Sequence, residues 1–100
     1  ARDALSQMPI PLPEHVTGKI ISGKVNIAWK TVTQEKISYT VVRKENTIPK
    51  SAEDGHIVVK EMFGNSTVDH SLKEGRIYYY KVFSVRNGVV SRQGKVIGPY

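Results

Sequence analysis

The sequence predicts an all-β fold, a sandwich or barrel of short antiparallel strands. Beyond residue 13, short runs rich in valine, isoleucine, tyrosine and threonine are separated by turn residues such as glycine, asparagine and proline. Apolar and polar side chains alternate within the clearest runs, which is the pattern of a strand with one buried face. No run of ten or more residues has a convincing helical period.

Length and composition indicate a single domain. The chain has 100 residues, of which 39% are hydrophobic and 24% are charged, enough for one core and too few for two. No apolar run approaches the roughly 18 residues of a membrane-spanning helix, so no membrane insertion is expected. Residues 1–13 do not resemble a signal peptide. The chain begins without Met and ends at Tyr100 with no polar tail, which predicts a segment of a longer protein.

Residues 1–13 are predicted to be a proline-containing linker that leads into a domain at residues 14–100. Pro9, Pro11 and Pro13 alternate with two aliphatic residues. This spacing favours extended, polyproline-like backbone and forbids a helix.

Two alternating runs predict strands in the first half of the domain. Residues 24–31 and 36–44 each place apolar side chains on one face, with mostly polar or small side chains on the other face of the first run. The buried faces are predicted to consist of Val25, Ile27 and Trp29 in the first run, and Ile37, Tyr39 and Val41 in the second.

The second half is predicted to hold a long loop at residues 47–55, a strand at 56–61 and a strongly apolar strand at 76–87. In this last strand Tyr78, Tyr80 and Val82 share one face, and mainly apolar side chains also line the other face. Asn87-Gly88 favours a tight hairpin into a final strand at 89–97. Further turns are predicted at single glycines, among them Gly18, Gly23, Gly64, Gly75 and Gly94.

The strand pattern resembles the fibronectin type III family over about Pro9 to Pro99. The resemblance implies an immunoglobulin-like β-sandwich of about seven antiparallel strands. The motifs that carry it are Val25-x-Ile27-x-Trp29, then Tyr39-x-Val41, then the run through Leu72, Gly75, Tyr78, Tyr80, Val82 and Ser84. The residues in these motifs are more similar to those of bacterial members of the family than to those of animal members.

The resemblance also implies structural roles. Trp29 is expected at the centre of the core, Leu72 is expected to close the loop before the strand at 76–87, and Tyr78 is expected to form a tyrosine corner. Tyr39 and Tyr80 are expected to be buried with them, at ~150 to 250 Å² each. Such modules usually belong to large multidomain proteins, and an extracellular or cell-surface location is expected over the cytoplasm.

The sequence predicts no catalytic residues, no metal site and no cofactor. Cysteine is absent, and His15, His56 and His70 lack a second ligand at metal-binding spacing, so surface positions are expected for them. Asp69-His70-Ser71 contains the residue types of a hydrolase triad. Because consecutive side chains cannot converge, Asp69 is expected to cap backbone amides in a loop instead.

The net charge of +6 gives an alternative function, weak binding of anionic polymers such as polysaccharide or nucleic acid. The 15 lysines and arginines are scattered, however, with Arg43-Lys44 as the only adjacent pair. This scatter is typical of solvated strand faces, so no specific nucleic-acid partner is expected.

An interaction surface is predicted on the outer face of the sheet formed by residues 36–44, 76–87 and 89–97. Two exposed aromatic rings flanked by cations would resemble a binding hot spot. In the alternative, the lysine stems lie over the rings and leave an inert patch. The outward side chains are predicted to be Tyr79, Lys81 and Phe83, beside Thr40, Val42 and Lys44.

These features together predict a non-catalytic spacer or protein-interaction module. Its expected partners are neighbouring domains of the same chain or another protein, and the isolated domain is expected to be monomeric. An accessory domain of an enzyme encoded elsewhere in the same chain is a further alternative.

Overall fold

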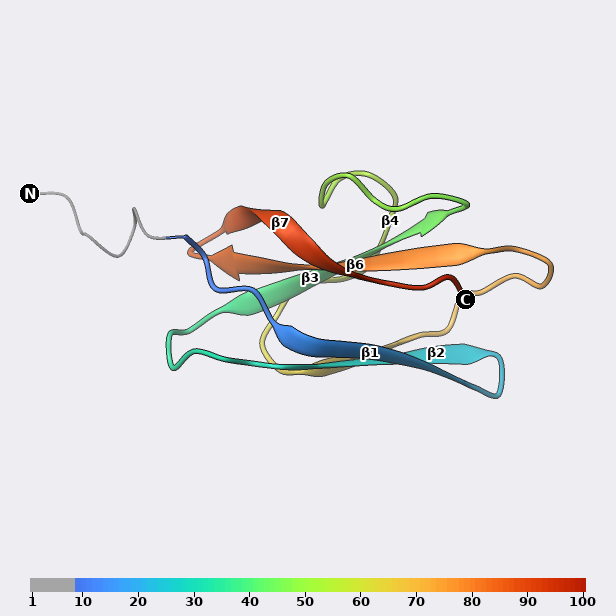
Figure 1. Cartoon of the computed structure of the whole chain (residues 1–100), viewed down its shortest axis with the longest axis horizontal. Coiled ribbons are helices and arrows are strands. Elements are labelled where there is room, and N and C mark those ends of the chain that lie inside the picture. The colour runs from blue at the N-terminus through green and yellow to red at the C-terminus, as the bar shows by residue number, and fades with distance from the viewer. Residues whose placement is uncertain (1–8) are drawn as a thin grey trace, which may run out of the picture.

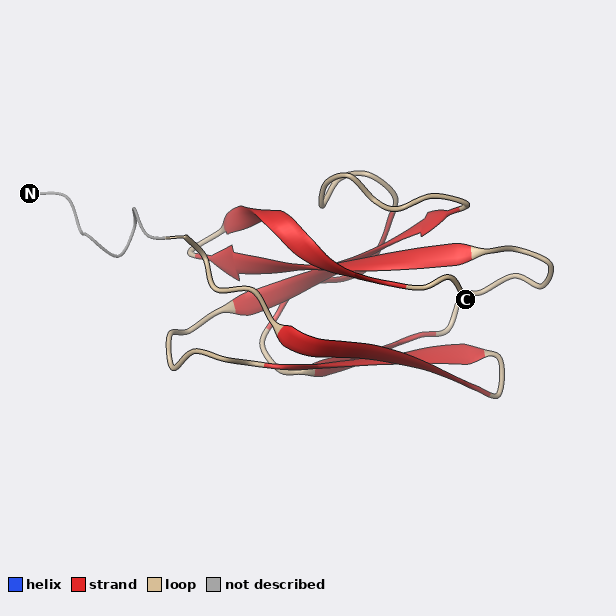
Figure 2. Ribbon diagram, in the orientation of Figure 1, coloured by secondary structure: helices blue, strands red, loops and turns tan. Residues whose placement is uncertain are grey.

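Seven antiparallel strands and no helix make up residues 9–100, the part of the chain that the computed structural model describes (Figure 2). One sheet has the strand order β1-β2-β5 and the other has the order β4-β3-β6-β7. The sheets face each other as the two layers of a sandwich (Figure 1), which confirms the predicted fold class. The strands are β1 (Glu14–Ile21), β2 (Lys24–Lys30), β3 (Ser38–Glu45), β4 (His56–Met62), β5 (Ser66–Asp69), β6 (Tyr78–Arg86) and β7 (Val89–Ile97).

The core lies between the two sheets, where the alternating patterns placed it. Trp29 and Tyr39 both belong to this core, with ring centroids 5.3 Å apart and planes tilted by 59°, a favourable aromatic arrangement. Leu72 packs against this core from the loop before β6. The buried cluster consists of Val25, Ile27, Trp29, Ile37, Tyr39, Val41, Tyr78, Tyr80 and Val82.

Two tight hairpins join strands that are neighbours in the sequence. Asn87 and Gly88 both have positive φ, at 48° and 78°, which confirms the predicted turn between β6 and β7. Ser22 and Gly23 repeat this geometry between β1 and β2, at 53° and 76°.

Gly18 and Gly94 do not form turns, contrary to the prediction, because they lie inside β1 and β7. Each permits a close approach that a side chain would block. A Cβ atom at Gly18 would lie 2.3 Å from the hydroxyl oxygen of Tyr100, and one at Gly94 would lie 2.7 Å from the carbonyl oxygen of Val82.

The segment before β1 packs on the sandwich. Ile10 packs against the core and Pro13 is fully buried, so the described part of the predicted linker is attached to the folded body. Residues 1–8 of that linker lie outside the described residues. At the other end of the chain, Tyr100 exchanges two backbone hydrogen bonds of 2.9 Å with Tyr78 at the start of β6.

Candidate interaction surface

The register of β3 and β6 brings the predicted surface residues together. The two strands pair antiparallel, so side chains that directly oppose each other point to the same face. This face lies away from the core, as predicted. The outward cross-strand pairs are Thr40 with Phe83, Val42 with Lys81 and Lys44 with Tyr79.

The prediction that this face exposes Phe83 and Val42 is wrong. Phe83 is 1% exposed and Val42 is 0% exposed, and Thr40 between them is also buried. Tyr79 and Lys81 are only partly exposed. The face is therefore largely covered.

The loop between β3 and β4 covers Val42. It lies on the side of β3 away from β1 and β2 (Figure 1), and a Cβ atom at Gly55 would lie 3.2 Å from Cγ1 of Val42. Lys44 Nζ donates to Asp54 Oδ1 at 2.5 Å, and the backbone N–H of Lys50 donates to Asp54 Oδ2 at 2.8 Å. These two hydrogen bonds lower the pKa of the Asp54 carboxyl and anchor the loop across β3.

Phe83 is covered from two other directions. It lies opposite Gly94 on β7, where a Cβ atom would be 3.2 Å from its ring, so the missing side chain makes room for the ring to lie against β7. Lys81 Nζ lies 5.3 Å from the centre of the same ring. The lysine therefore covers the ring, as in the alternative predicted for this face.

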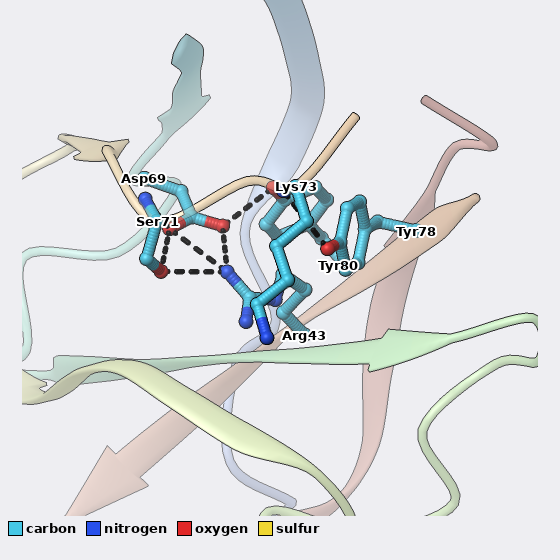
Figure 3. A network of polar contacts seen from close by, with 6 residues as sticks. All are labelled: Arg43, Asp69, Ser71, Lys73, Tyr78 and Tyr80. Carbon is cyan, nitrogen blue, oxygen red and sulfur yellow. Dashed lines mark hydrogen bonds and ion pairs between the residues drawn. The ribbon is translucent and has the colours of Figure 1, made fainter. Parts of the chain in front are cut away.

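A polar network that the sequence does not predict ties the two sheets together (Figure 3). Asp69 ends β5 in one sheet, whereas Arg43 and Tyr80 belong to β3 and β6 in the other. Tyr80 Oη donates to Asp69 Oδ2 at 2.7 Å, and Arg43 Nη1 donates to the same oxygen at 2.9 Å. Ser71 Oγ donates to Oδ1 at 2.9 Å. The Asp69 carboxylate, 3% exposed, is thus fully occupied by donors.

The electrostatics of this network favour a structural role. Burial alone would raise the pKa of the Asp69 carboxyl, but hydrogen bonds from Tyr80, Arg43 and Ser71 outweigh burial and lower it. Burial, followed by the hydrogen bond to Asp69, raises the pKa of the Tyr80 hydroxyl far above its usual range. A carboxylate this strongly bound is a poor base or nucleophile.

Asp69 also caps the loop that follows it, as predicted. The backbone N–H of Ser71 donates to Asp69 Oδ1 at 3.1 Å, while His70 between them is exposed. The other partners of Asp69 are Arg43 and Tyr80, which lie 26 and 11 residues away in the chain, so the sequence around Asp69 does not predict them.

The predicted tyrosine corner is confirmed. Tyr78 is 4% exposed, and its hydroxyl oxygen accepts a hydrogen bond of 3.1 Å from the backbone N–H of Lys73 (Figure 3). The guanidinium of Arg43 lies 4.7 Å from the Tyr78 ring centre, which connects the corner to the polar network. Tyr79 points to the opposite face.

Metal ligands are not gathered anywhere in residues 9–100. No three histidine, aspartate or glutamate side chains of this range could hold an ion, and His15, His56 and His70 are all exposed. The same range contains no helix that could cross a membrane.

Comparison with known proteins identifies the fold. No family model and no curated protein matches the chain. Among solved structures, a fibronectin type III domain of human collagen XX superposes with a TM-score of 0.65 over 97% of both chains, at 21% identity. The chain has the fibronectin type III fold. The spore cortex lytic enzyme SleM of Clostridium perfringens also contains this arrangement, with a TM-score of 0.68 and 14% identity. That match covers 95% of this chain and 29% of the enzyme.

Proposed function

We propose that this fibronectin type III module is a non-catalytic spacer that joins its neighbours end to end and offers them a contact surface. The observation that carries the proposal is the position of Pro9 and Tyr100, the first and last of the described residues. The carbonyl oxygen of Pro9 accepts a hydrogen bond of 3.4 Å from Nη2 of Arg86, the last residue of β6. Tyr100 pairs through its backbone with Tyr78, the first residue of the same strand. The start of the described residues lies toward one end of the sandwich and the C-terminus toward the other (Figure 1).

The length of β6 sets the separation of the two ends. This strand has nine residues, so its eight steps span about 26 Å. The Asp69 network between the sheets and the Tyr100 pair at the exit resist changes in that distance. A module of this kind supports a fixed spacing, which a flexible linker of similar length does not.

For the contact surface we propose Tyr79, Lys81 and Lys44, with Val42 and Phe83 beneath them as support. These three side chains are partly exposed and combine an aromatic ring with two lysines, of which Lys44 is paired with Asp54. A neighbouring domain is the expected partner, because inter-domain interfaces are smaller and more polar than permanent ones. An extracellular or cell-surface location belongs to this proposal.

The match to SleM supports a second candidate, an accessory domain of an enzyme. There the same fold occupies 29% of a chain that is named as a lytic enzyme. As an accessory domain, the module would position a catalytic domain of the same chain and would have no catalytic residues of its own. Because one fold hosts many functions, the resemblance leaves this role as a proposal.

The proposal is tested by exchange in a protein that carries the module. Residues 9–100 are replaced either by an unrelated rigid sandwich of similar end-to-end length or by a flexible Gly/Ser linker. A spacer predicts that only the rigid replacement retains the activity of the parent protein. A contact surface predicts that Tyr79→Ser weakens binding to the neighbouring domain while the fold is retained. If the flexible linker works as well and Tyr79→Ser has no effect, both parts of the proposal are refuted.

A further inference from the structure

A groove with a volume of about 900 Å³ lies between the segment before β1 and the first half of β7. Ile10 and Leu12 line one side, and Val89 and Val90 line the other. Val89 is 62% exposed and Val90 is 39% exposed. This groove is on a different surface from Tyr79 and Lys81.

The groove exists because two extended segments lie near each other without pairing. Among the described residues, β7 pairs only with β6, so its second edge has no partner strand. The segment across the groove carries Pro9, Pro11 and Pro13, and proline has no backbone N–H to donate. Because the three prolines occupy alternate positions, one edge of this extended segment has no backbone N–H donors, which disfavours pairing with β7 through that edge.

A bulge in β7 shapes the far end of the groove. Between the pairs Val85–Val90 and Phe83–Gly94, Ser84 alone on β6 faces residues 91–93 on β7. The backbone N–H of Ser84 donates to a side chain there, Ser91 Oγ, at 3.1 Å. Bulges end regular pairing and bend the strand, so the open edge is regular mainly next to Val89 and Val90.

The charge of the groove is positive. No aspartate or glutamate lines it, whereas Arg86 and Arg92 do. Arg86 is buried and bound to Glu35. Arg92 is exposed, and it forms no ion pair among residues 9–100. Arg92 can therefore form an ion pair with an acidic group of a bound ligand.

We propose that the groove binds a short extended segment of a partner protein in which apolar and acidic residues alternate. The segment adds a strand to the open edge at Val89 and Val90, and its apolar side chains pack on Ile10 and Leu12. Its acidic side chain pairs with Arg92. Strand addition supplies affinity through backbone hydrogen bonds and specificity through alternate side chains. This inference does not depend on the spacer function.

To test this proposal, heptapeptides that bind the whole 100-residue chain are selected from a random phage-displayed library. We expect selected sequences to alternate valine or isoleucine with aspartate or glutamate and to be depleted in proline. Synthetic peptides are then measured by fluorescence anisotropy. Methylation of the backbone nitrogens that face β7 should abolish binding, since it removes the donors of the added strand.

Charge reversal in the protein provides the matched comparison. Arg92→Glu should lower the affinity for an acidic peptide about fivefold to tenfold, because exposed charge pairs contribute about 1 kcal/mol or less and reversal adds repulsion. The same variant should raise the affinity for a peptide in which lysine replaces the acidic residues. Lys60→Glu, a charge reversal at an exposed residue of β4 on the far edge of the same sheet, should change neither affinity. The unchanged fluorescence of Trp29, the single tryptophan, reports that each variant is folded.

Four outcomes would overturn the proposal. Selected peptides without acidic residues would show that Arg92 does not select the ligand. Equal binding of methylated peptides would show recognition by side chains without an added strand. Binding that appears only after removal of residues 1–8 would assign the groove to the chain's own N-terminal segment. Dimerisation in sedimentation experiments that Arg92→Glu abolishes would assign it to a second copy.

Discussion

Replacing Asp69 by asparagine tests whether the polar network holds the two sheets together. The substitution keeps the shape of the side chain and one acceptor oxygen, but it removes the charge that Arg43 faces. The guanidinium of Arg43 then stays in place with its side chain only 13% exposed and without a counter-charge.

The expected loss follows from that burial. Breaking a buried ion pair by removing one partner costs about 3 to 5 kcal/mol. Arg43 retains some contact with water, and the introduced amide oxygen would still accept a hydrogen bond from Tyr80. We therefore expect Asp69→Asn to lower the free energy of unfolding by about 2 to 4 kcal/mol, somewhat less than the full loss of a buried pair. A domain of this size has a total stability of about 5 to 15 kcal/mol, so the variant should be clearly destabilised but folded.

Urea unfolding followed by the fluorescence of Trp29 measures this difference, since the residue is 4% exposed in the core. The matched control is the double variant Arg43→Met with Asp69→Asn. It removes both charges, so it should be more stable than the sum of the two single changes predicts.

The pH dependence provides an independent check with a defined sign. The pKa of the Asp69 carboxyl is lowered in the folded protein, so its ionised form contributes stability above the unfolded value of about 3.9. This contribution is lost as the pH falls through the lower folded value. The stability difference between wild type and Asp69→Asn should therefore be full at about pH 7 and shrink below about pH 4. A difference under about 0.5 kcal/mol at neutral pH, which is the range of ordinary surface substitutions, or one that does not change with acid, would refute this account of the network.

Three smaller changes give further predictions. Tyr78→Phe should cost about 1 kcal/mol in urea unfolding, because the backbone N–H of Lys73 loses its acceptor; a loss no larger than that of Tyr79→Phe would contradict the corner. Gly18→Ala should cost about 1 to 3 kcal/mol by displacing the Tyr100 ring, and a cost that persists in a Tyr100→Ala background would place the clash elsewhere. Asp54→Ala should let trypsin cleave the loop between β3 and β4 while the free energy of unfolding changes by less than about 1 kcal/mol; resistance equal to wild type would show that other contacts anchor the loop.

Alternation along single strands predicted most of the fold. The inward positions of Trp29, Tyr39 and Tyr78 depend on a period of two within one strand, and all three are buried. The same pattern assigned Phe83 and Val42 to the outer face correctly but predicted their exposure wrongly. Exposure depends on segments that return from elsewhere, such as the loop that brings Gly55 over β3, and local alternation has no information about them.

The polar network was not predicted, also because its contacts depend on segments that are distant in the sequence. Asp69 shows its capping role through Ser71, two residues away, whereas its stronger partners are set by the pairing of distant strands. Arg43 and Tyr80 become neighbours only through the register of β3 and β6. The available signal was Arg43 itself, an arginine that follows Tyr39 and Val41 on the inward face of β3.

The positions of the chain ends also determine how the module would carry tension. Force applied at Pro9 and Tyr100 pulls β1 and β7 in opposite directions along their own axes, each against an antiparallel partner. Interstrand hydrogen bonds in antiparallel pairs run perpendicular to the strands, so they are loaded together in shear and are not opened one at a time. The first and last strands would then have to slide past β2 and β6 before the core is exposed, and unfolding under load would be governed by a rate rather than by the equilibrium stability.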